Sequence, residues 1–535
     1  MSSEDKIAQE TKQGASESCS AWLLVAIAIY LARILSWAMS EFWYDEVLTF
    51  GNFVLDPQKV GTFEAVFRTY PIANNHILST AIYAVWTKCL NYDLSSEFLA
   101  RIPSIIEGLL LIAVVSLHWR KWIGDRIAIL GAIAFAISPV FTAFAYQVRG
   151  YSLSMLLSAT AISGAMECAK GKKALGLSIA FASCLLLPLV IPSNALVAPV
   201  IAVVILASTK NFLFAAVPLV GAAIGGSYYF TIWDQFVEAS KEPGGWDSSW
   251  AVALHLALAF AVHCGVILVC TPFKGEKNAN DESTNAKNRH LPLWILLACA
   301  LTIGGVLGYF SHARAPYPRV FLVFLPIGSF AVLFAARNSI LSTTKTIIPL
   351  LAIFAVGFRT EKYTSHITHQ ALVKGESPLN LLQQYYRGSS ELRTLAHEEY
   401  PEGCFIITDE YDQPTMELYN YMNGRPDGIV VSPNKIAKDF IKDEATGQIK
   451  MAFAVAKNPQ IAANLLSHAG YGTPEELLDS FTNEMLPDEM RMYIPKVFPD
   501  NIRQIYAPPI KPLRNPFFKK SPKEEIPALK NSQIL

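Results

Sequence analysis

Long apolar runs, separated by short polar loops, fill the chain from residue 21 to about residue 360. A helix needs about 20 mostly apolar residues to cross the hydrocarbon core of a bilayer. By this measure the pattern predicts about eleven membrane-spanning helices, at 21–40, 98–118, 127–145, 151–168, 174–191, 193–208, 212–231, 250–272, 291–310, 319–336 and 339–358. The chain is therefore expected to be a polytopic α-helical membrane protein.

The segment 74–90, NNHILSTAIYAVWTKCL, decides how the later loops divide between the two membrane faces. Its apolar residues recur at helical spacing on one side, a pattern that favours a helix lying in the interface over a helix that crosses. If it does not cross, the basic loops at 120–126, 170–173 and 274–289 all fall on one face. The positive-inside rule makes that face cytoplasmic. The tail 1–20 is then inside, and the large first loop 41–97 is outside.

The pattern changes after residue 360. Residues 361–506 are polar and contain no run long enough to span a membrane. CFIITDE (404–410) and GIVVS (428–432) are typical of short buried strands. We therefore expect a transmembrane domain at 21–360 and a small soluble α/β domain at 361–506, on the outer face. The proline- and lysine-rich tail 507–535 is expected to be extended or disordered.

Composition agrees with a membrane protein and narrows its partners. Only 16% of the residues are charged, against roughly 25% in a soluble domain. Lysines plus arginines equal aspartates plus glutamates, 44 each, so no excess of positive charge indicates nucleic-acid binding. No cysteine and histidine spacing indicates a zinc site. No cofactor is certain, although Asp45, Glu46 and His76 would form a weak site for a divalent metal.

Two acids and three arginines fall at the outer face. Asp45 and Glu46 follow the first predicted span in FWYDEVLTF (42–50), and Arg149, Arg314 and Arg319 lie in short outer loops. Arginine binds phosphate bidentately and stays charged at any relevant pH, and a carboxylate can take the proton of an attacking hydroxyl. This set predicts arginines holding a lipid-linked phosphate and an acid activating an acceptor. Each residue alone also fits a solvated helix end or an interfacial side chain.

The order of the segments resembles the GT-C glycosyltransferases. It is most similar to the bacterial relatives of dolichyl-phosphate-mannose protein mannosyltransferases and of the aminoarabinose transferase acting on lipid A. WYDEVLT (43–49) resembles the first-loop acidic motif, NNHILSTAIYAVW (74–86) the Asn-His-Pro-Pro-Leu segment, SPVFTAFAYQVRGYSLSMLL (138–157) the Tyr-Ser-Gln-Glu-Ala-Arg-Met-Tyr segment, and PRVFLVFLP (318–326) the Pro-Arg-Tyr segment. Two departures stand out: Ile77 and Leu78 follow His76 in place of prolines, and no glutamate precedes Arg149.

The resemblance implies an inverting transfer of a sugar from a polyprenyl-phosphate donor. The acceptor would be a protein, a glycolipid or an envelope polysaccharide at the periplasmic face of a bacterial inner membrane. Asp45 would be the general base, with Glu46 assisting, and Arg149, Arg314 and Arg319 would bind the donor phosphate. The residues expected to line the pocket are His76, Tyr146, Gln147, Tyr151 and Tyr317.

Two other functions stay open on the sequence alone. A transporter or lipid flippase places ionisable residues at mid-membrane depth, often on broken helices in inverted repeats. No repeat is visible here, and Glu107, halfway along 98–118, is the residue that would favour transport. A receptor that binds ligand through its outer α/β domain is the third hypothesis.

Overall fold

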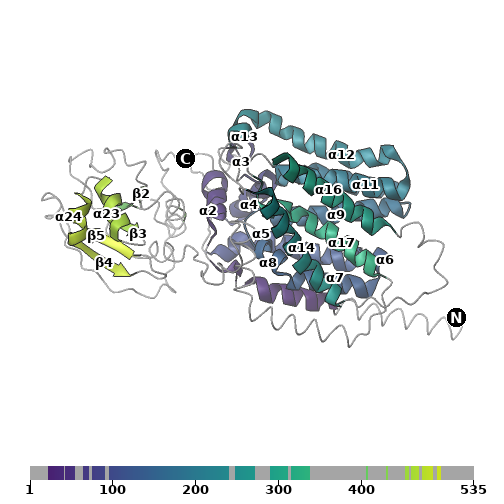
Figure 1. Cartoon of the computed structure of the whole chain (residues 1–535), viewed down its shortest axis with the longest axis horizontal. Helices are drawn as coiled ribbons and strands as arrows, with labels where there is room; N and C mark the ends of the chain where they lie inside the picture. The colour runs from purple at the N-terminus through teal and green to yellow at the C-terminus, as the bar shows by residue number, and fades with distance from the viewer. Residues whose placement is uncertain are drawn as a thin grey trace. The chain divides into compact units, whose positions relative to one another are not determined.

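The computed structural model describes sixteen stretches of the chain. These are residues 22–35, 37–40, 42–54, 64–70, 75–90, 96–239, 248–270, 290–310, 315–337, 405–407, 418, 429–431, 452–456, 459–468, 473–485 and 491–495. The chain divides into two compact units (Figure 1). The first unit holds Met1–Met39, Val66–Trp86 and Ala100–Tyr386, and the second holds Ser40–Ala65, Thr87–Leu99 and Arg387–Leu535.

Helices make up nearly all of the described part of the chain before residue 340. After a first apolar helix, Trp22–Leu35, the elements are α2 (Tyr44–Thr49), η1 (Phe50–Val54), α3 (Glu64–Arg68), α4 (Ile77–Cys89), α5 (Glu97–Ala113), η2 (Val114–His118), α6 (Arg120–Ile123), α7 (Asp125–Ile137), α8 (Pro139–Ala145), α9 (Tyr151–Ala169), α10 (Lys173–Val190), η3 (Pro192–Leu196), α11 (Val197–Thr209), α12 (Phe212–Ser227), η4 (Tyr228–Ile232), α13 (Trp233–Ala239), α14 (Ser249–Cys270), α16 (Leu291–Tyr309), η7 (Pro318–Phe324) and α17 (Leu325–Ala336).

Seven helices in the described part are long and apolar enough to cross a bilayer. They are Glu97–Ile123, Tyr151–Ala169, Lys173–Val190, Pro192–Thr209, Phe212–Ala239, Leu291–Tyr309 and Pro318–Ala336. All seven coincide with predicted spans, so the chain is a polytopic helical membrane protein. The count of eleven stays a prediction, because the first helix and α14 are described as shorter apolar helices and 339–358 lies outside the described residues.

The predicted span 127–145 is bent. α7 and α8 meet at an angle of 63°, and counting this pair as one span gives eight. The break falls at Ser138, which has an extended ψ of 120° and precedes Pro139. A proline ring clashes with a helical residue before it, so the bend is encoded locally. Ser138 then caps α8 by accepting the N–H of Phe141 at 3.4 Å.

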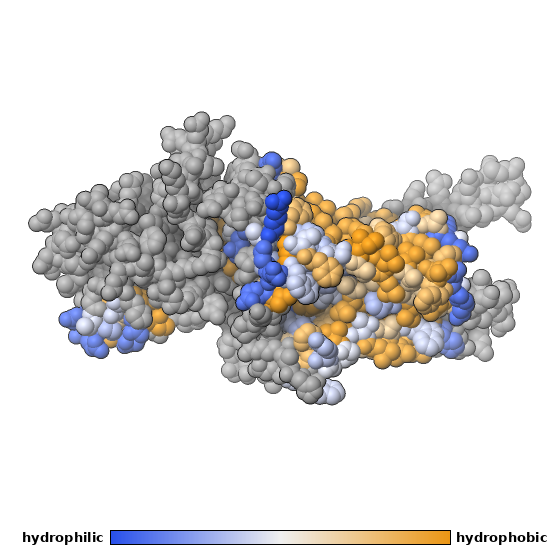
Figure 2. Space-filling view, turned by 90° about the horizontal axis from the view of Figure 1, so that it is seen from above, coloured by the Kyte–Doolittle hydropathy of each residue, from blue (hydrophilic) through white to orange (hydrophobic). Residues whose placement is uncertain are grey.

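α9 and η7–α17 form the centre of the first unit. In each of these two helices 78% of the apolar stretch is buried inside the protein, whereas in α16 only 28% is buried. α9 packs against α10, α11, η7 and α17. The outer helices expose large apolar side chains such as Leu219, Leu254 and Leu301, and orange residues cover much of the helical body in Figure 2. In a membrane this apolar surface faces lipid.

Two described turns of the first unit lie at opposite ends of the bundle, one before α9 and one after it. At one end, called here the site end, the turn between α8 and α9 meets the start of α4. At the other, called the lysine end, the turn between α9 and α10 meets α6 (Figure 1). α4 itself has 13 residues, fewer than the roughly 20 that a span requires.

The described strands of the second unit form one mixed sheet with the order β2-β1-β3-β5-β4. β1 pairs in parallel with β2 and β3, while β5 runs antiparallel to β3 and β4. β1 and β2 lie inside the two segments where the sequence predicts strands. The remaining bounds are β3 (Ala452–Ala456), β4 (Phe481–Met485), β5 (Arg491–Pro495), α23 (Pro459–His468) and α24 (Pro474–Ser480), with β1 at Phe405–Ile407 and β2 at Ile429–Val431.

Candidate functional site

A tight turn between α8 and α9 carries Arg149. The Arg149 N–H donates to the carbonyl oxygen of Gln147 at 2.6 Å. That same carbonyl also accepts the hydroxyl of Ser104 from α5 and the hydroxyl of Tyr83 from α4, the latter at 3.3 Å. The Gln147 amide donates back to the Ala143 oxygen at 2.9 Å. Gln147 is buried, and both its backbone and its side chain hold the turn.

His76, directly before α4, fixes the same turn. Its Nδ1 accepts the Gly150 N–H at 2.8 Å, which leaves the proton of a neutral ring on Nε2. The imidazole lies edge-on to the Tyr151 ring, with 5.6 Å between centroids. A Cβ added at Gly150 would lie 2.9 Å from His76 Nδ1 and 2.5 Å from Val190 Cγ1. Glycine is therefore required at 150 by the close approach of α4 and α10.

Two arginines act on His76. The Arg149 guanidinium lies 5.8 Å from the Tyr151 ring centroid, and that of Arg319 lies 4.8 Å from the Tyr317 ring centroid. Burial, and then the charges of Arg149 and Arg319, hold the pKa of His76 well below its usual value. The imidazole is therefore neutral at pH 7, and the two arginines bring two permanent positive charges to its surroundings.

Tyr70 is a further member of this cluster. Burial raises the pKa of its hydroxyl to about 12, an effect that the charge of Arg149 partly offsets. The segment before it is held by Asn75, whose amide donates to the carbonyl oxygens of Val66 at 2.9 Å and Thr69 at 3.2 Å. Tyr70 therefore stays a protonated hydrogen-bond donor near Arg149. Tyr70 could not be predicted from the sequence, since 64–70 matches no motif.

Tyr146 has a different setting. Its ring stacks on Trp37, with 6.0 Å between centroids, and the Arg101 guanidinium lies 5.1 Å from its centroid. Arg101 is fully buried and donates to the carbonyl oxygens of Trp37 at 2.9 Å and Ala38 at 3.1 Å. Arg101 thus closes the end of the first helical segment. Tyr146 packs in this scaffold, while the arginine that anchors it was missed by the sequence analysis.

Glu107 serves the start of α9. Gly150 precedes that helix and offers no side-chain cap, but the Leu153 N–H donates to the Glu107 carboxylate from the first turn. This bond satisfies one of the backbone N–H groups that have no partner within the helix at its start. The acid that would have favoured transport is accounted for here as a cap supplied by α5.

Asp45 and Glu46 belong to the second unit and lie in the first turn of α2. The Trp43 N–H donates to Glu46 Oε2 at 2.9 Å, and Glu46 is fully buried. This is the reciprocal half of a capping box. Asp45 is half-buried, and its backbone oxygen accepts the Thr49 hydroxyl at 3.0 Å. The two acids therefore differ: Glu46 is buried and caps the helix, whereas Asp45 is half-buried.

The predicted site residues thus have different settings, with Asp45 and Glu46 in the second unit. His76, Arg149, Tyr151, Arg319 and Tyr317 gather at the site end, while Tyr146 and Gln147 support the turn. Arg314 lies outside the described residues. In the described part of the chain no three histidine, cysteine or acidic side chains are placed to hold a metal ion. His76 belongs to the first unit, and Asp45 and Glu46 to the second, so the weak site for a divalent metal stays a prediction from the sequence.

Solved structures share this fold. ArnT from Cupriavidus metallidurans in the apo state superposes with a TM-score of 0.55 at 13% sequence identity, over 90% of this chain and 98% of the ArnT chain. The same protein bound to undecaprenyl phosphate superposes with a TM-score of 0.53 at 14% identity and the same coverage. No protein-family model and no curated protein matches the chain. ArnT is a GT-C glycosyltransferase, so the predicted resemblance is confirmed at the level of the fold.

Proposed function

We propose that this chain, which has the fold of ArnT, is a membrane glycosyltransferase that takes a sugar from a polyprenyl-phosphate donor. One observation carries the proposal: the buried His76 holds the turn that carries Arg149, and the charges of both Arg149 and Arg319 reach this histidine at one end of the helical bundle. ArnT has been solved with undecaprenyl phosphate bound, a ligand with a single phosphate and a long apolar tail. Paired arginines at a membrane face suit such a ligand.

The arginines stabilise the leaving group in this proposal. When the bond between the anomeric carbon and the phosphate oxygen breaks, negative charge grows on the phosphate. Arg149 and Arg319 bring two positive charges, and such preorganised charges lower the barrier where charge develops. The Nε2–H of His76 and the Tyr70 hydroxyl add two neutral donors. Tyr151 and Tyr317 orient the two guanidinium groups by stacking.

Asp45 is the proposed base. The acceptor hydroxyl attacks the anomeric carbon from the face opposite the phosphate, so the configuration inverts, and its proton passes to the Asp45 carboxylate. Polyprenyl phosphate leaves with the electrons of the broken bond. Glu46 supports this step by holding the first turn of α2. Arg314 is kept as a third candidate for the phosphate on the basis of its place in the sequence.

The proposed setting is the periplasmic face of a bacterial inner membrane. Two of the basic loops, 120–126 and 170–173, meet at the lysine end, and the positive-inside rule makes that end cytoplasmic. The site end and the soluble domain at 361–506 would then face outward, where a protein, a glycolipid or an envelope polysaccharide can serve as the acceptor. The domain boundaries at 20, 360 and 506 are part of this proposal.

Mass spectrometry of envelope lipids and glycans tests the function. A strain without this chain should lack one sugar, and wild-type protein should restore it. Asp45→Asn should fail to restore it, whereas Asp234→Asn, at an exposed acid of α13, should succeed. Both variants should reach the membrane in equal amounts. Normal restoration by Asp45→Asn would remove the assignment of the base, and an unchanged envelope in the deletion strain would remove the proposed transfer.

The break between α7 and α8 is the one feature that favours a transporter or flippase instead. Ser138 at the break contacts His263 Nδ1 at 2.7 Å, and His263 Nε2 contacts the Ser329 hydroxyl at 2.8 Å. These neutral groups satisfy one another inside the bundle, as at a fixed bend. Movement of undecaprenyl phosphate across liposomes that contain the purified chain, without any sugar transfer, would support the transporter.

A further inference from the structure

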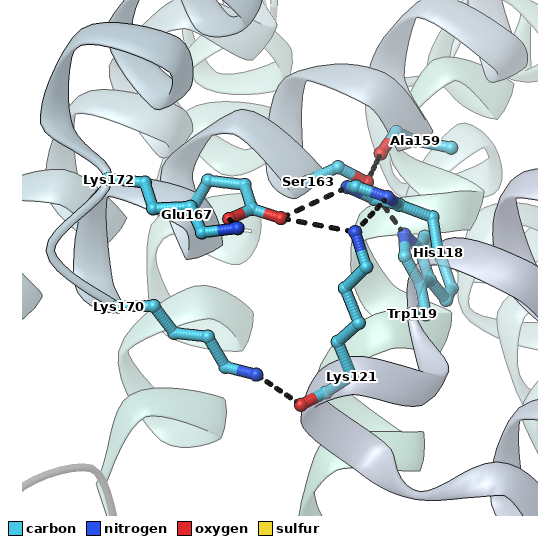
Figure 3. A network of polar contacts seen from close by, with 8 residues as sticks. All are labelled: His118, Trp119, Lys121, Ala159, Ser163, Glu167, Lys170 and Lys172. Carbon is cyan, nitrogen blue, oxygen red and sulfur yellow. Dashed lines mark hydrogen bonds and ion pairs between the residues drawn. The ribbon is translucent and has the colours of Figure 1, made fainter.

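A group of basic side chains surrounds one buried carboxylate at the lysine end (Figure 3). Glu167, in the last turn of α9, is almost completely buried. Its carboxylate lies 3.5 Å from Lys121 Nζ, 3.8 Å from Lys172 Nζ and 3.8 Å from His118 Nε2. Lys170 joins the group by donating to the Lys121 carbonyl oxygen. We call Lys121, Lys170 and Lys172 the lysine cluster.

The backbone fixes two of these lysines. The backbone N–H of Lys172 donates to the backbone carbonyl oxygen of Glu167 at 3.0 Å, and that of Gly171 donates to the backbone carbonyl oxygen of Cys168 at 3.0 Å. Gly171 has a φ of +89°. This is the Schellman arrangement that ends a helix on a left-handed glycine. Lys170 and Lys172 are therefore presented from a rigid turn.

The close packing of α9 on α10 holds that turn in place. A Cβ at Gly164 would come 2.7 Å from the Ala180 nitrogen, and one at Gly176 would come 2.6 Å from the Cys168 nitrogen. Small residues at such positions let two membrane helices approach closely. The lysine cluster is consequently built on fixed elements of the bundle.

Positive charge exceeds negative charge in this group. The segments 119–126 and 167–173, which contribute all three lysines, contain six lysines and arginines and two acids. Burial lowers the pKa of Lys170, Glu167 opposes this shift, and repulsion from Lys121 and Lys172 adds to it. One carboxylate does not neutralise three ammonium groups, so a second anion would be stabilised here.

Exposed apolar side chains lie near the lysine cluster in the sequence, as expected at the level of lipid headgroups. Leu117 of η2 and Leu175 of α10 are exposed; Leu117 lies four positions before Lys121 in the sequence, and Leu175 lies three positions after Lys172. The ammonium group of Lys173 lies 5.4 Å from the Phe214 ring centroid. Apolar side chains at a helix end, with charged groups beyond them, are typical of the level where acyl chains meet headgroups.

We propose that the lysine cluster binds a phosphate ester, and that the exposed apolar side chains beside it select one carried by an anionic membrane lipid. Lys121, Lys170 and Lys172 donate to the phosphate oxygens. Glu167 keeps the lysines close together while limiting the net charge. The lipid site lies at the opposite end of the bundle from Arg149 and does not depend on the proposed sugar transfer.

Native mass spectrometry of the full chain with added phosphatidylglycerol tests this proposal. Each lysine near a lipid phosphate contributes about a fivefold gain in affinity, so Lys170→Gln with Lys172→Gln should weaken binding by about twentyfold. Lys210→Asn is the matched control, because Lys210 lies in the next turn at the same end with a left-handed φ of 56°, which asparagine tolerates. It should bind like the wild type.

Glu167→Gln supplies a change of opposite sign, because loss of the competing carboxylate should tighten lipid binding severalfold. If Glu167→Gln does not fold, the lysine variants still test the proposal, because Lys170 and Lys172 are exposed. Equal binding by the double lysine variant and the wild type would overturn the site. Displacement of the lipid by inorganic phosphate at similar concentration would overturn the choice of a lipid over a free phosphate.

Discussion

His76 Nδ1 accepts the backbone N–H of Gly150 at 2.8 Å, so the residue that precedes α4 holds the turn that carries Arg149. The two residues lie 74 positions apart in the chain. This bond links a segment that is too short to span a membrane to the start of α9, one of the two central helices of the bundle. The position of Arg149 thus depends on α4 as much as on its own loop.

Gly150→Ala is the direct test of this relationship. The added methyl group would overlap Val190 Cγ1 and His76 Nδ1, and overpacking of this kind costs about 1–3 kcal/mol. We expect a lower unfolding temperature in detergent and weaker binding of undecaprenyl phosphate. Gly304→Ala in α16 is the control, since no atom lies within 4 Å of its Cβ position. Equal unfolding temperatures for the two variants would show that the approach at Gly150 is looser than described.

The neutral state of His76 predicts a dependence of stability on pH. Its pKa is lowered in the folded chain, so the unfolded chain binds the proton first as the pH falls. The stabilisation is therefore complete above about pH 6.5 and is lost as the pH drops towards the folded pKa. One such group changes the free energy of unfolding by at most about 1.4 kcal/mol per pH unit.

His76→Asn isolates this effect, because the amide oxygen can accept the Gly150 N–H but does not titrate. Thermal unfolding between pH 8 and pH 5 should show a shallower loss for His76→Asn than for the wild type. His76→Leu, which removes the acceptor, should be less stable at every pH. Parallel curves for the wild type and His76→Asn would mean that His76 does not stay neutral in the folded protein.

The sequence predicts the spans well because each apolar run is a local signal. The site is harder to predict, and the segment 146–151 shows why. Tyr146 and Tyr151 are five positions apart, yet one packs on Trp37 and the other on His76. The contact from the Arg149 N–H to the Gln147 oxygen reverses the chain between them. This turn cannot be predicted from the spacing of apolar residues, because it also depends on Tyr83 and Ser104, which come from other helices.

The two acids of FWYDEVLTF illustrate the same limit. The sequence indicates both as candidate catalytic residues, since nothing in it distinguishes two adjacent carboxylates in one loop. They separate once α2 begins at Tyr44, because the third helical position then belongs to Glu46 and its side chain reaches back to the Trp43 N–H. Where a helix begins is among the least certain features of a sequence-based prediction, so the separation needed the fold.

Substitutions of Glu46 should therefore act through stability. Glu46→Ala removes a capping interaction worth about 0.5–2 kcal/mol, and both the unfolding temperature and sugar transfer should fall. Glu46→Gln keeps an acceptor for the Trp43 N–H and should retain most of both. If Glu46→Gln lost sugar transfer at an unchanged unfolding temperature, Glu46 would have a chemical role beyond the cap.

Replacing Arg149 or Arg319 even by lysine should weaken the binding of undecaprenyl phosphate. A lysine keeps the charge but offers one ammonium group where a guanidinium offers a planar fork that matches phosphate. We expect Arg149→Lys and Arg319→Lys each to weaken undecaprenyl phosphate binding by about tenfold or more, which corresponds to about 1.4 kcal/mol. Lys88→Arg, at an exposed position of α4, is the control for arginine and lysine exchange. Unchanged binding in both site variants would place the donor phosphate elsewhere.

Arg101 should behave as a scaffold residue. Arg101→Leu leaves the buried carbonyl oxygens of Trp37 and Ala38 without the donor they have now, and a buried polar group that loses its partner costs about 1–3 kcal/mol. A lower unfolding temperature is therefore expected, whereas Arg68→Leu, at an exposed arginine of α3, should change it little. At a temperature where Arg101→Leu is still folded, it should bind undecaprenyl phosphate more tightly than Arg149→Lys does. If instead Arg101→Leu unfolded like the wild type and failed to bind, Arg101 would belong to the phosphate site.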